Sequence, residues 1–149
     1  MSAAANCFFV DTNVLLYSFD ATDPTKRARA RQWMDALWAT DSGRLSWQVL
    51  NEFYSNAVGK MKTPAVLARE NVETLALWRP VNFGLGVLHR AWYWTDRASI
   101  SYWDALIVAA AESTGCTYLL SEDFQAGRKF DDLTVVNPFL TAPDNFGFK

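Results

Sequence analysis

Two aspartates stand where strands of a sheet are expected to end. Asp11 directly follows the apolar run of residues 8–10, and Asp123 comes soon after the run of residues 118–120. Ligands of open parallel sheets bind just beyond the carboxyl ends of the strands, so neighbouring strands would bring both carboxylates into one crevice. Each aspartate alone is equally well explained as the cap of the following helix or turn, and the case for chemistry rests on further acids.

Asp104 is the third acid of interest. It lies between Trp103 and the apolar residues 105–111, a pattern that predicts a helix buried nearly all round. A carboxylate stays ionised in such surroundings only where another charge compensates it, and a metal ion would do so. The alternative is a capping box, because Ser101 and Asp104 have the S-x-x-D spacing of a helix start. The two roles are compatible.

Glu52 is the fourth acid, in the middle of a predicted helix. If Val49, Leu50, Phe53 and Ala57 form the buried side of that helix, Glu52 lies at the edge of the apolar stripe. A side chain that lines a cleft would lie there. A solvated glutamate would lie there as well, so this position carries weight only together with the other three.

The type of ligand predicts the type of ion. The chain has four such carboxylates and only one histidine, His89, which favours a hard cation, Mg²⁺ or Mn²⁺, over zinc. Such a site suits metal-assisted hydrolysis of a phosphodiester bond. Cys7 and Cys116 lack the paired spacing of a zinc site, and we expect both to be buried and reduced.

Size and composition set the limits of the fold. With 149 residues, half of them hydrophobic, we expect residues 1–149 to form one domain around a core of about residues 8–140. The net charge of −2 argues weakly against a dedicated binder of duplex DNA. No apolar run approaches the roughly 20 residues of a membrane helix, and the first six residues lack the features of a signal peptide. A cytoplasmic protein with no membrane association is therefore predicted.

The elements that must position the four acids alternate along the chain. Strands are predicted at residues 8–10, 44–46, 80–83, 117–120 and 133–136. Helices are predicted at residues 14–19, 24–41, 47–58, 64–77, 85–97 and 102–113. Strands that alternate with helices indicate an α/β sandwich with a mainly parallel sheet.

Four segments resemble the motifs of a known family. Residues 10–17, which contain Asp11, are similar to the opening motif of the PIN-domain nucleases. Residues 45–53, 101–111 and 119–124 resemble the second, third and fourth motifs, and they contain the other three acids. The ending at residues 133–139 looks like the tail of VapC-type toxins, a compact PIN subgroup. The resemblance covers residues 8–140, and the order and spacing of the motifs make it specific.

The resemblance implies a fold and an activity. The fold would be a three-layer α/β/α sandwich. The activity would be that of a ribonuclease whose Mg²⁺ or Mn²⁺ is held by Asp11, Glu52, Asp104 and Asp123. Thr12, Asn13 and Ser121 would orient the substrate or the metal ligands, and Glu122 remains an alternative to Asp123. Family members commonly form homodimers, and a cognate antitoxin silences them.

Two further groups of residues allow more than one interpretation. Lys26, Arg27, Arg29 and Arg31 form the densest basic run, which is either a solvated helix face or a set of RNA phosphate contacts. The segment Trp92-Tyr93-Trp94 is hard to bury whole, because three consecutive positions span most of a helix circumference. A placement with one part in the core and one at its rim is the simplest interpretation. A partner interface and stacking on unpaired bases are the alternatives.

Other functions fit the sequence less well. A haloacid-dehalogenase-like phosphatase also has an aspartate after its first strand, but it needs a second acid two residues on, where this chain has Asn13. A binding module without catalysis would be favoured by a missing carboxylate, and all four are present. A housekeeping RNA-processing nuclease of the same family remains an alternative to a toxin.

Overall fold

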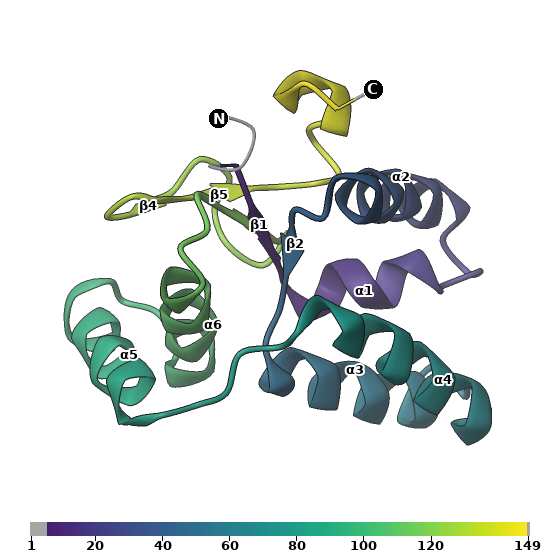
Figure 1. Ribbon diagram of the computed structural model, residues 1–149, viewed down its shortest axis with the longest axis horizontal. Coiled ribbons are helices and arrows are strands. Elements are labelled where there is room, and N and C mark those ends of the chain that lie inside the picture. Colours follow the sequence, from purple (N-terminus) through teal and green to yellow (C-terminus); the bar gives the residue numbers. More distant parts are fainter. Residues whose placement is uncertain (1–5, 149) are drawn as a thin grey trace.

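A central sheet organises the molecule. The computed structural model describes residues 6–148, and most of the leader examined for a signal peptide lies outside these residues. In the described part the sheet has five strands in the order β2-β1-β3-β5-β4. The bounds are β1 Phe8–Val10, β2 Gly43–Arg44, β3 Tyr118–Leu120, β4 Lys129–Phe130 and β5 Leu133–Val136. All neighbouring strands are parallel except β4, which runs antiparallel to β5 (Figure 1).

Several helices begin directly after a residue whose side chain caps their first turn. The helix bounds are α1 Thr12–Ser18, α2 Pro24–Thr40, α3 Trp47–Gly59, α4 Ala65–Leu75, α5 Leu85–Arg97 and α6 Tyr102–Ser113, with 3₁₀ turns η2 Ala76–Trp78 and η3 Pro143–Phe146. The side chains of Asp23, Ser46 and Ser101 each accept a backbone N–H in the first turn of the following helix. The helix starts predicted at these three residues are therefore confirmed.

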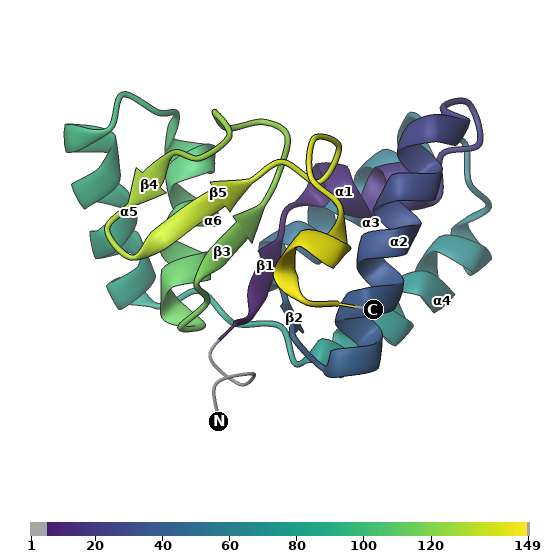
Figure 2. The same ribbon diagram turned by 90° about the horizontal axis from the view of Figure 1, so that it is seen from above.

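Helices cover both faces of the sheet. Figures 1 and 2 show α5 and α6 on one face, and α2 with η3 on the other. The predicted three-layer α/β/α sandwich with a mainly parallel sheet is confirmed. None of the helices in the described part of the chain is both long enough and apolar enough to cross a membrane.

Phe8 is the centre of the aromatic packing between β1 and α2. Its ring is fully buried and lies 5.2 Å from that of Trp33 on α2 and 4.8 Å from that of Tyr118 on β3. Phe146 and Phe148, from the C-terminal segment, complete the cluster at 5.4 and 5.7 Å. The C-terminal segment thus covers the same face of the sheet as α2, which fixes β1 and the residue that follows it.

Several predicted details are wrong. The strand expected at residues 80–83 is only a single bridge between Val81 and Ser46, because Pro80 has no N–H to extend a ladder. The two-residue strand β4 and the turn η3 were not predicted. The spacing of Trp38 with Ala30, Trp33, Met34 and Leu37 predicts a core position on the same helix face, but Trp38 is 37% exposed and its ring lies against that of Trp78.

Candidate active site

Asp11 and Ser121 lie side by side at the carboxyl ends of adjacent strands. Val10 of β1 is the register partner of Leu120 of β3, and the Asp11 backbone N–H donates to the Leu120 carbonyl at 3.0 Å. One residue beyond each strand, Ser121 Oγ donates to Asp11 Oδ2 at 2.8 Å. The order of the strands reverses at β1, because β2 lies on one side of β1 and the later strands lie on the other. Open α/β sheets bind ligands at such a reversal.

The carboxylate of Asp11 is buried and costly to ionise. The residue is 6% exposed, and its pKa is raised from 3.8 to about 7, mainly by burial. The negative charges of Asp123 and Glu52 contribute to this rise, whereas hydrogen bonds from Ser121 and from the Thr12 N–H oppose it. Asp11 is also the N-cap of α1, so the capping role and the position in the acidic cluster coexist.

Asn13 joins the ends of the two strands. Its amide nitrogen donates to Asp11 Oδ2 at 3.3 Å, to Ser121 Oγ at 3.2 Å and to Asp123 Oδ2 at 3.0 Å. Its amide oxygen accepts from the Glu122 N–H at 3.3 Å. Position 13 therefore holds an amide that orients two carboxylates, which is a different arrangement from the acid pair of a phosphatase.

Glu52 reaches the cluster from α3. Thr12 Oγ1 donates to Glu52 Oε1 at 3.4 Å, so the glutamate faces the first turn of α1. Burial raises the pKa of Glu52, and the charges of Asp104 and Asp123 raise it further. The residue as a whole is exposed beside buried Phe53, which is the predicted position at the edge of the apolar stripe.

Asp104 is less buried than its sequence predicts. Residues 105–111 are buried, but Asp104 lies in the first turn of α6 and is only partly covered, because the preceding residues of the turn face solvent. Its N–H donates to Ser101 Oγ at 3.1 Å, which confirms the capping role of Ser101. Burial and the charge of Asp123 raise the pKa of Asp104. Asp104 thus lies at the partly exposed edge of the acidic cluster, close enough to Asp123 for their charges to interact.

The cluster as a whole is a site of unbalanced negative charge. Each of Asp11, Glu52 and Asp104 has its pKa raised by at least one of the other acids. In the described residues no three acidic, histidine or cysteine side chains come close enough together to hold a metal ion by themselves. The donor set is oxygen only, and Mg²⁺ typically uses one or two carboxylates plus waters and substrate phosphates. Such a cation fits these residues.

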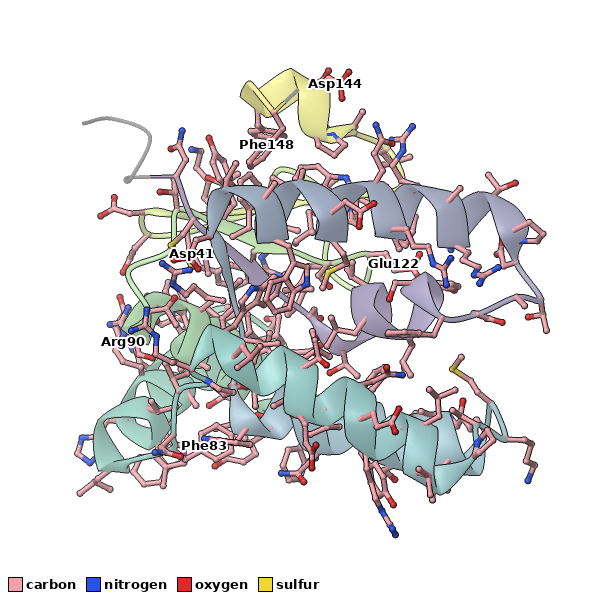
Figure 3. The ribbon with its side chains drawn as sticks, turned by 45° about the vertical axis from the view of Figure 1, so that its right-hand side comes forward. Asp41, Phe83, Arg90, Glu122, Asp144 and Phe148 are labelled. Atoms are coloured by element: carbon pink, nitrogen blue, oxygen red, sulfur yellow. The ribbon has the colours of Figure 1, made fainter. Side chains whose placement is uncertain are left out.

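The side chain of Glu122 forms an ion pair with α2 and is not part of the acidic cluster. Its Oε2 forms an ion pair with Lys26 Nζ at 2.6 Å, and in Figure 3 Glu122 lies between α1 and α2. The same ammonium group lies 4.6 Å from the ring centre of Tyr17 and 4.9 Å from that of Phe139. Asp123, in contrast, is bonded to Asn13 next to Asp11. The geometry therefore favours Asp123 over Glu122 as the fourth acid.

The basic run is largely engaged with the protein itself. Besides the ion pair of Lys26, Arg29 donates to the Pro138 carbonyl at 3.4 Å and Arg31 to the Ser18 carbonyl at 2.8 Å. Arg27 is half-buried. A simple solvated face is thus a poor description of this side of α2. The structure gives the basic residues anchoring contacts, and their contact with RNA stays a prediction.

The segment Trp92-Tyr93-Trp94 divides between core and surface. Trp94 is buried, and its indole N–H donates to Glu112 at 2.8 Å. Trp92 is 47% exposed and stacks on His89, while Tyr93 is half-buried. The predicted placement in core and rim is confirmed.

A groove next to the cluster was not anticipated from the sequence. It has a volume of about 620 Å³, and Asn13, which is bonded to Asp11 and Asp123, lies in its lining together with Glu122. A helical spacing in the sequence marks one face of each of two helices, but not that these faces meet in a groove. Residues 13 and 17 lie four apart on α1, and residues 52, 56 and 60 follow the same spacing along α3 and its C-cap.

Comparisons with known proteins agree with this geometry. The family model described as PIN domain matches residues 8–131. A toxin-antitoxin complex from Klebsiella pneumoniae contains a chain with 18% identity and a TM-score of 0.67, over 89% of this chain and 98% of that chain. Mycobacterium tuberculosis VapC20, described as a sarcin-ricin loop cleaving toxin, has 21% identity and a TM-score of 0.59, over 78% of this chain and 89% of its own. The comparison with curated proteins found no match. The solved structures share the fold, and the family model spans most of the sequence, so this chain belongs to the PIN-domain family.

Proposed function

We propose that the protein is a metal-dependent endoribonuclease and the toxin of a toxin–antitoxin pair that acts in the cytoplasm. The observation that carries the proposal is the buried Asp11 carboxylate, held by Ser121 and surrounded by three further acids at the edge of a parallel sheet. Membership of the PIN-domain family supports it. So do the two structural neighbours, one from a toxin-antitoxin complex and one described as a sarcin-ricin loop cleaving toxin.

The metal of the proposal is Mg²⁺ or Mn²⁺. Asp11, Glu52, Asp104 and Asp123 would hold it, one or two of them directly and the others through its waters, because they form an all-oxygen donor set whose charges otherwise repel one another. A bound divalent ion lowers the pKa of an attacking water and stabilises charge on the phosphate oxygens. Burying Asp11 without such a cation favours its protonated form, so the ion and the ionised carboxylate would stabilise each other.

The neighbouring polar residues keep the acids in place. Ser121 and the Thr12 N–H each donate to Asp11, at 2.8 and 2.7 Å, which fixes the plane of its carboxylate. Asn13 holds Asp123 at 3.0 Å, and Thr12 Oγ1 holds Glu52 at 3.4 Å. These bonds orient acceptors that would otherwise turn away from one another, and they reduce the reorganisation needed when substrate binds.

Replacing Asp11 by Asn tests the nuclease. We expect RNA cleavage to fall by about 10³-fold or more, since loss of one metal ligand removes several kcal/mol of transition-state stabilisation. Cleavage by the unaltered protein should also stop in excess EDTA and return with Mg²⁺ or Mn²⁺. Glu70→Gln, at an exposed acid on α4, is the matched control and should retain activity. Full activity of the Asp11→Asn variant, or cleavage that EDTA does not affect, would contradict the proposal.

The toxin role and the assembly have separate tests. Expression of the unaltered chain should arrest growth, and co-expression of a small protein encoded directly upstream should restore it. A housekeeping RNA-processing nuclease would not be toxic in this way.

We also propose that the protein forms a homodimer, because Trp103 and Leu85 are 65% and 64% exposed, and large exposed apolar side chains often mark a surface that a partner covers. Light scattering on the purified protein would give a monomer mass if this part is wrong.

A further inference from the structure

The groove beside the carboxylates offers a binding site of its own. It lies between α1, the turn after α1 and the C-terminal end of α3, and its volume of about 620 Å³ exceeds that of a single nucleobase. Asn13 lines the groove and is bonded to Asp11 and Asp123, so the groove adjoins the carboxylate cluster. A chain whose phosphate lay at the acids would therefore place an adjoining nucleotide in or over the groove.

We propose that this groove binds an unpaired base of the RNA next to the cleaved phosphate, and that it favours a base with an exocyclic amino group. The inference rests on the proposed ribonuclease function and adds a base-recognition site to it. The four acids proposed to hold the metal do not line the groove, and Asn13, which orients two of them, lies at its edge. The residues that carry the inference are Tyr17, Phe19, Asp20, Asn56 and Lys60.

The charges in the groove favour a base over a phosphate. Glu122 is neutralised by Lys26, whereas no lysine or arginine of the described residues forms an ion pair with Asp20. Asp20 Oδ1 accepts from the Thr22 N–H at 3.0 Å and from its hydroxyl at 2.6 Å, and these bonds lower the pKa of Asp20. An ionised carboxylate repels a phosphate, whereas it accepts hydrogen bonds from the amino group of adenine, cytosine or guanine.

The aromatic residues of the groove provide stacking surfaces. Phe19 is 39% exposed, and its ring is anchored 5.6 Å from that of buried Phe53. Tyr17 is half-buried beneath the Lys26 ammonium group. An exposed aromatic ring next to a nuclease centre is suited to stack on an unpaired base.

The far end of the groove supplies the remaining polar groups. Asn56 lies one helical turn beyond Glu52, and its amide nitrogen donates to the Glu52 carbonyl at 2.8 Å, which leaves the amide oxygen as an acceptor facing the groove side of α3. Lys60 follows at the exposed C-cap of α3 and is placed to meet a backbone phosphate. The groove combines these polar groups with the apolar side chains of Leu16, Ala21 and Met61, a mixture that suits the polar edge and the apolar face of a base.

The test uses short RNA oligonucleotides that differ only in the base on either side of the cleaved bond. For Phe19→Ala we expect kcat/KM to fall about 10- to 100-fold, the range that loss of one base-stacking ring gives, and Phe19→Trp should restore most of it. The matched control is Phe83→Ala, since Phe83 is 46% exposed and lies away from Glu122 in Figure 3. This control should cleave as the unaltered protein does.

A second variant reads the base itself. Asp20→Asn offers a donor as well as an acceptor, so the ratio of kcat/KM for an amino-bearing base over uracil should fall about 10-fold or more, with little change for uracil. A merely structural role of Asp20 would lower both values equally. Thermal unfolding of each variant shows whether it is folded.

The outcomes separate the two proposals. Equal cleavage by Phe19→Ala and the unaltered protein, with an unchanged base preference in Asp20→Asn, would overturn the groove assignment alone. The same result together with weaker binding of the antitoxin by Phe19→Ala would overturn it in favour of a protein-docking role. If the unaltered protein cleaves no RNA, the proposed function fails and the base site fails with it.

Discussion

Strands β1 and β3 bury side chains of different chemistry at their two ends, although the side chains are about equally buried. At the carboxyl end, Asp11 is 6% exposed and Ser121 is fully buried; at the amino end, Cys116 is 6% exposed and its sulfur lies 2.7 Å from that of Cys7. Buried thiols behave as small apolar groups and need no counter-charge, whereas a buried carboxylate is stable only if it is protonated or paired. The amino end of the two strands therefore buries neutral thiols, whereas the carboxyl end buries a carboxylate whose ionisation is unfavourable. We attribute this unfavourable burial of Asp11 to function.

The largest effect on stability is expected towards the amino end. Phe8→Ala removes a fully buried ring that packs on Trp33, Tyr118 and the C-terminal aromatics, and it should lower the free energy of unfolding by about 3–5 kcal/mol. Urea unfolding measures this. Leu140→Ala, at a residue that is 74% exposed, is the control and should change stability by less than about 0.5 kcal/mol. A similar loss in both variants would show that the cluster around Phe8 is not the core.

The carboxyl end is expected to behave in the opposite way. Asp11 has its pKa raised from 3.8 to about 7 in the folded state, so the folded protein binds the proton more tightly than the unfolded chain does. Without divalent ions, stability should therefore fall as the pH rises from about 4 to about 7. Asp11→Asn should reduce this dependence to the part that comes from Glu52 and Asp104, whose pKa values are also raised, and should be more stable at pH 8 by at most about 4 kcal/mol at about 1.4 kcal/mol per pKa unit.

The measurement for Asp11 is the urea midpoint across that pH range in EDTA. Glu70→Gln, which alters an exposed acid, should follow the unaltered protein. Addition of Mg²⁺ should flatten the curve of the unaltered protein only. Parallel curves for Asp11→Asn and the unaltered protein would mean that Asp11 carries no burial cost, and the contrast between the two ends would disappear.

The sequence was sufficient for features set by local pattern. Apolar runs that end at Asp11 and near Ser121 locate the two strand ends, and Ser46 and Ser101 mark helix starts through their own hydrogen bonds. The alternation of strands and helices then gives the layered fold. These features depend on residues within a few positions of one another, so tertiary contacts had little to change.

Features that join distant segments could not be predicted. The pair of Lys26 and Glu122 spans 96 positions of the sequence, and it decides which of two adjacent acids faces the cluster. The partial exposure of Asp104 depends on where α6 begins relative to the neighbouring elements. The groove is formed by α1 and α3 together, so neither helix alone shows it.

A smaller effect is expected at the edge strand near the amino end of β1. Gly43 of β2 pairs with Phe8, and a Cβ atom there would lie 2.3 Å from the buried ring of Trp78. Gly43→Ala should therefore destabilise the fold by about 1–3 kcal/mol through overpacking, measured by urea unfolding. Gly59→Ala is the control, because its Cβ would meet nothing within 4 Å. Equal stability of both variants would show that Trp78 moves aside freely.

The smallest effects on stability are expected at Cys116 and Ser121, two small buried residues near the amino and carboxyl ends of β3. They allow the two ends of one strand to be compared directly. Cys116→Ala and Ser121→Ala should each cost about 1 kcal/mol, the first through a lost sulfur contact and the second through lost hydrogen bonds. Only Ser121→Ala should slow RNA cleavage. Because the Ser121 hydroxyl lowers the pKa of Asp11, its removal should also move the fall in stability to higher pH. If Cys116→Ala slows cleavage as much, the amino end of the strands takes part in function, and the division of the sheet into a catalytic end and a structural end is wrong.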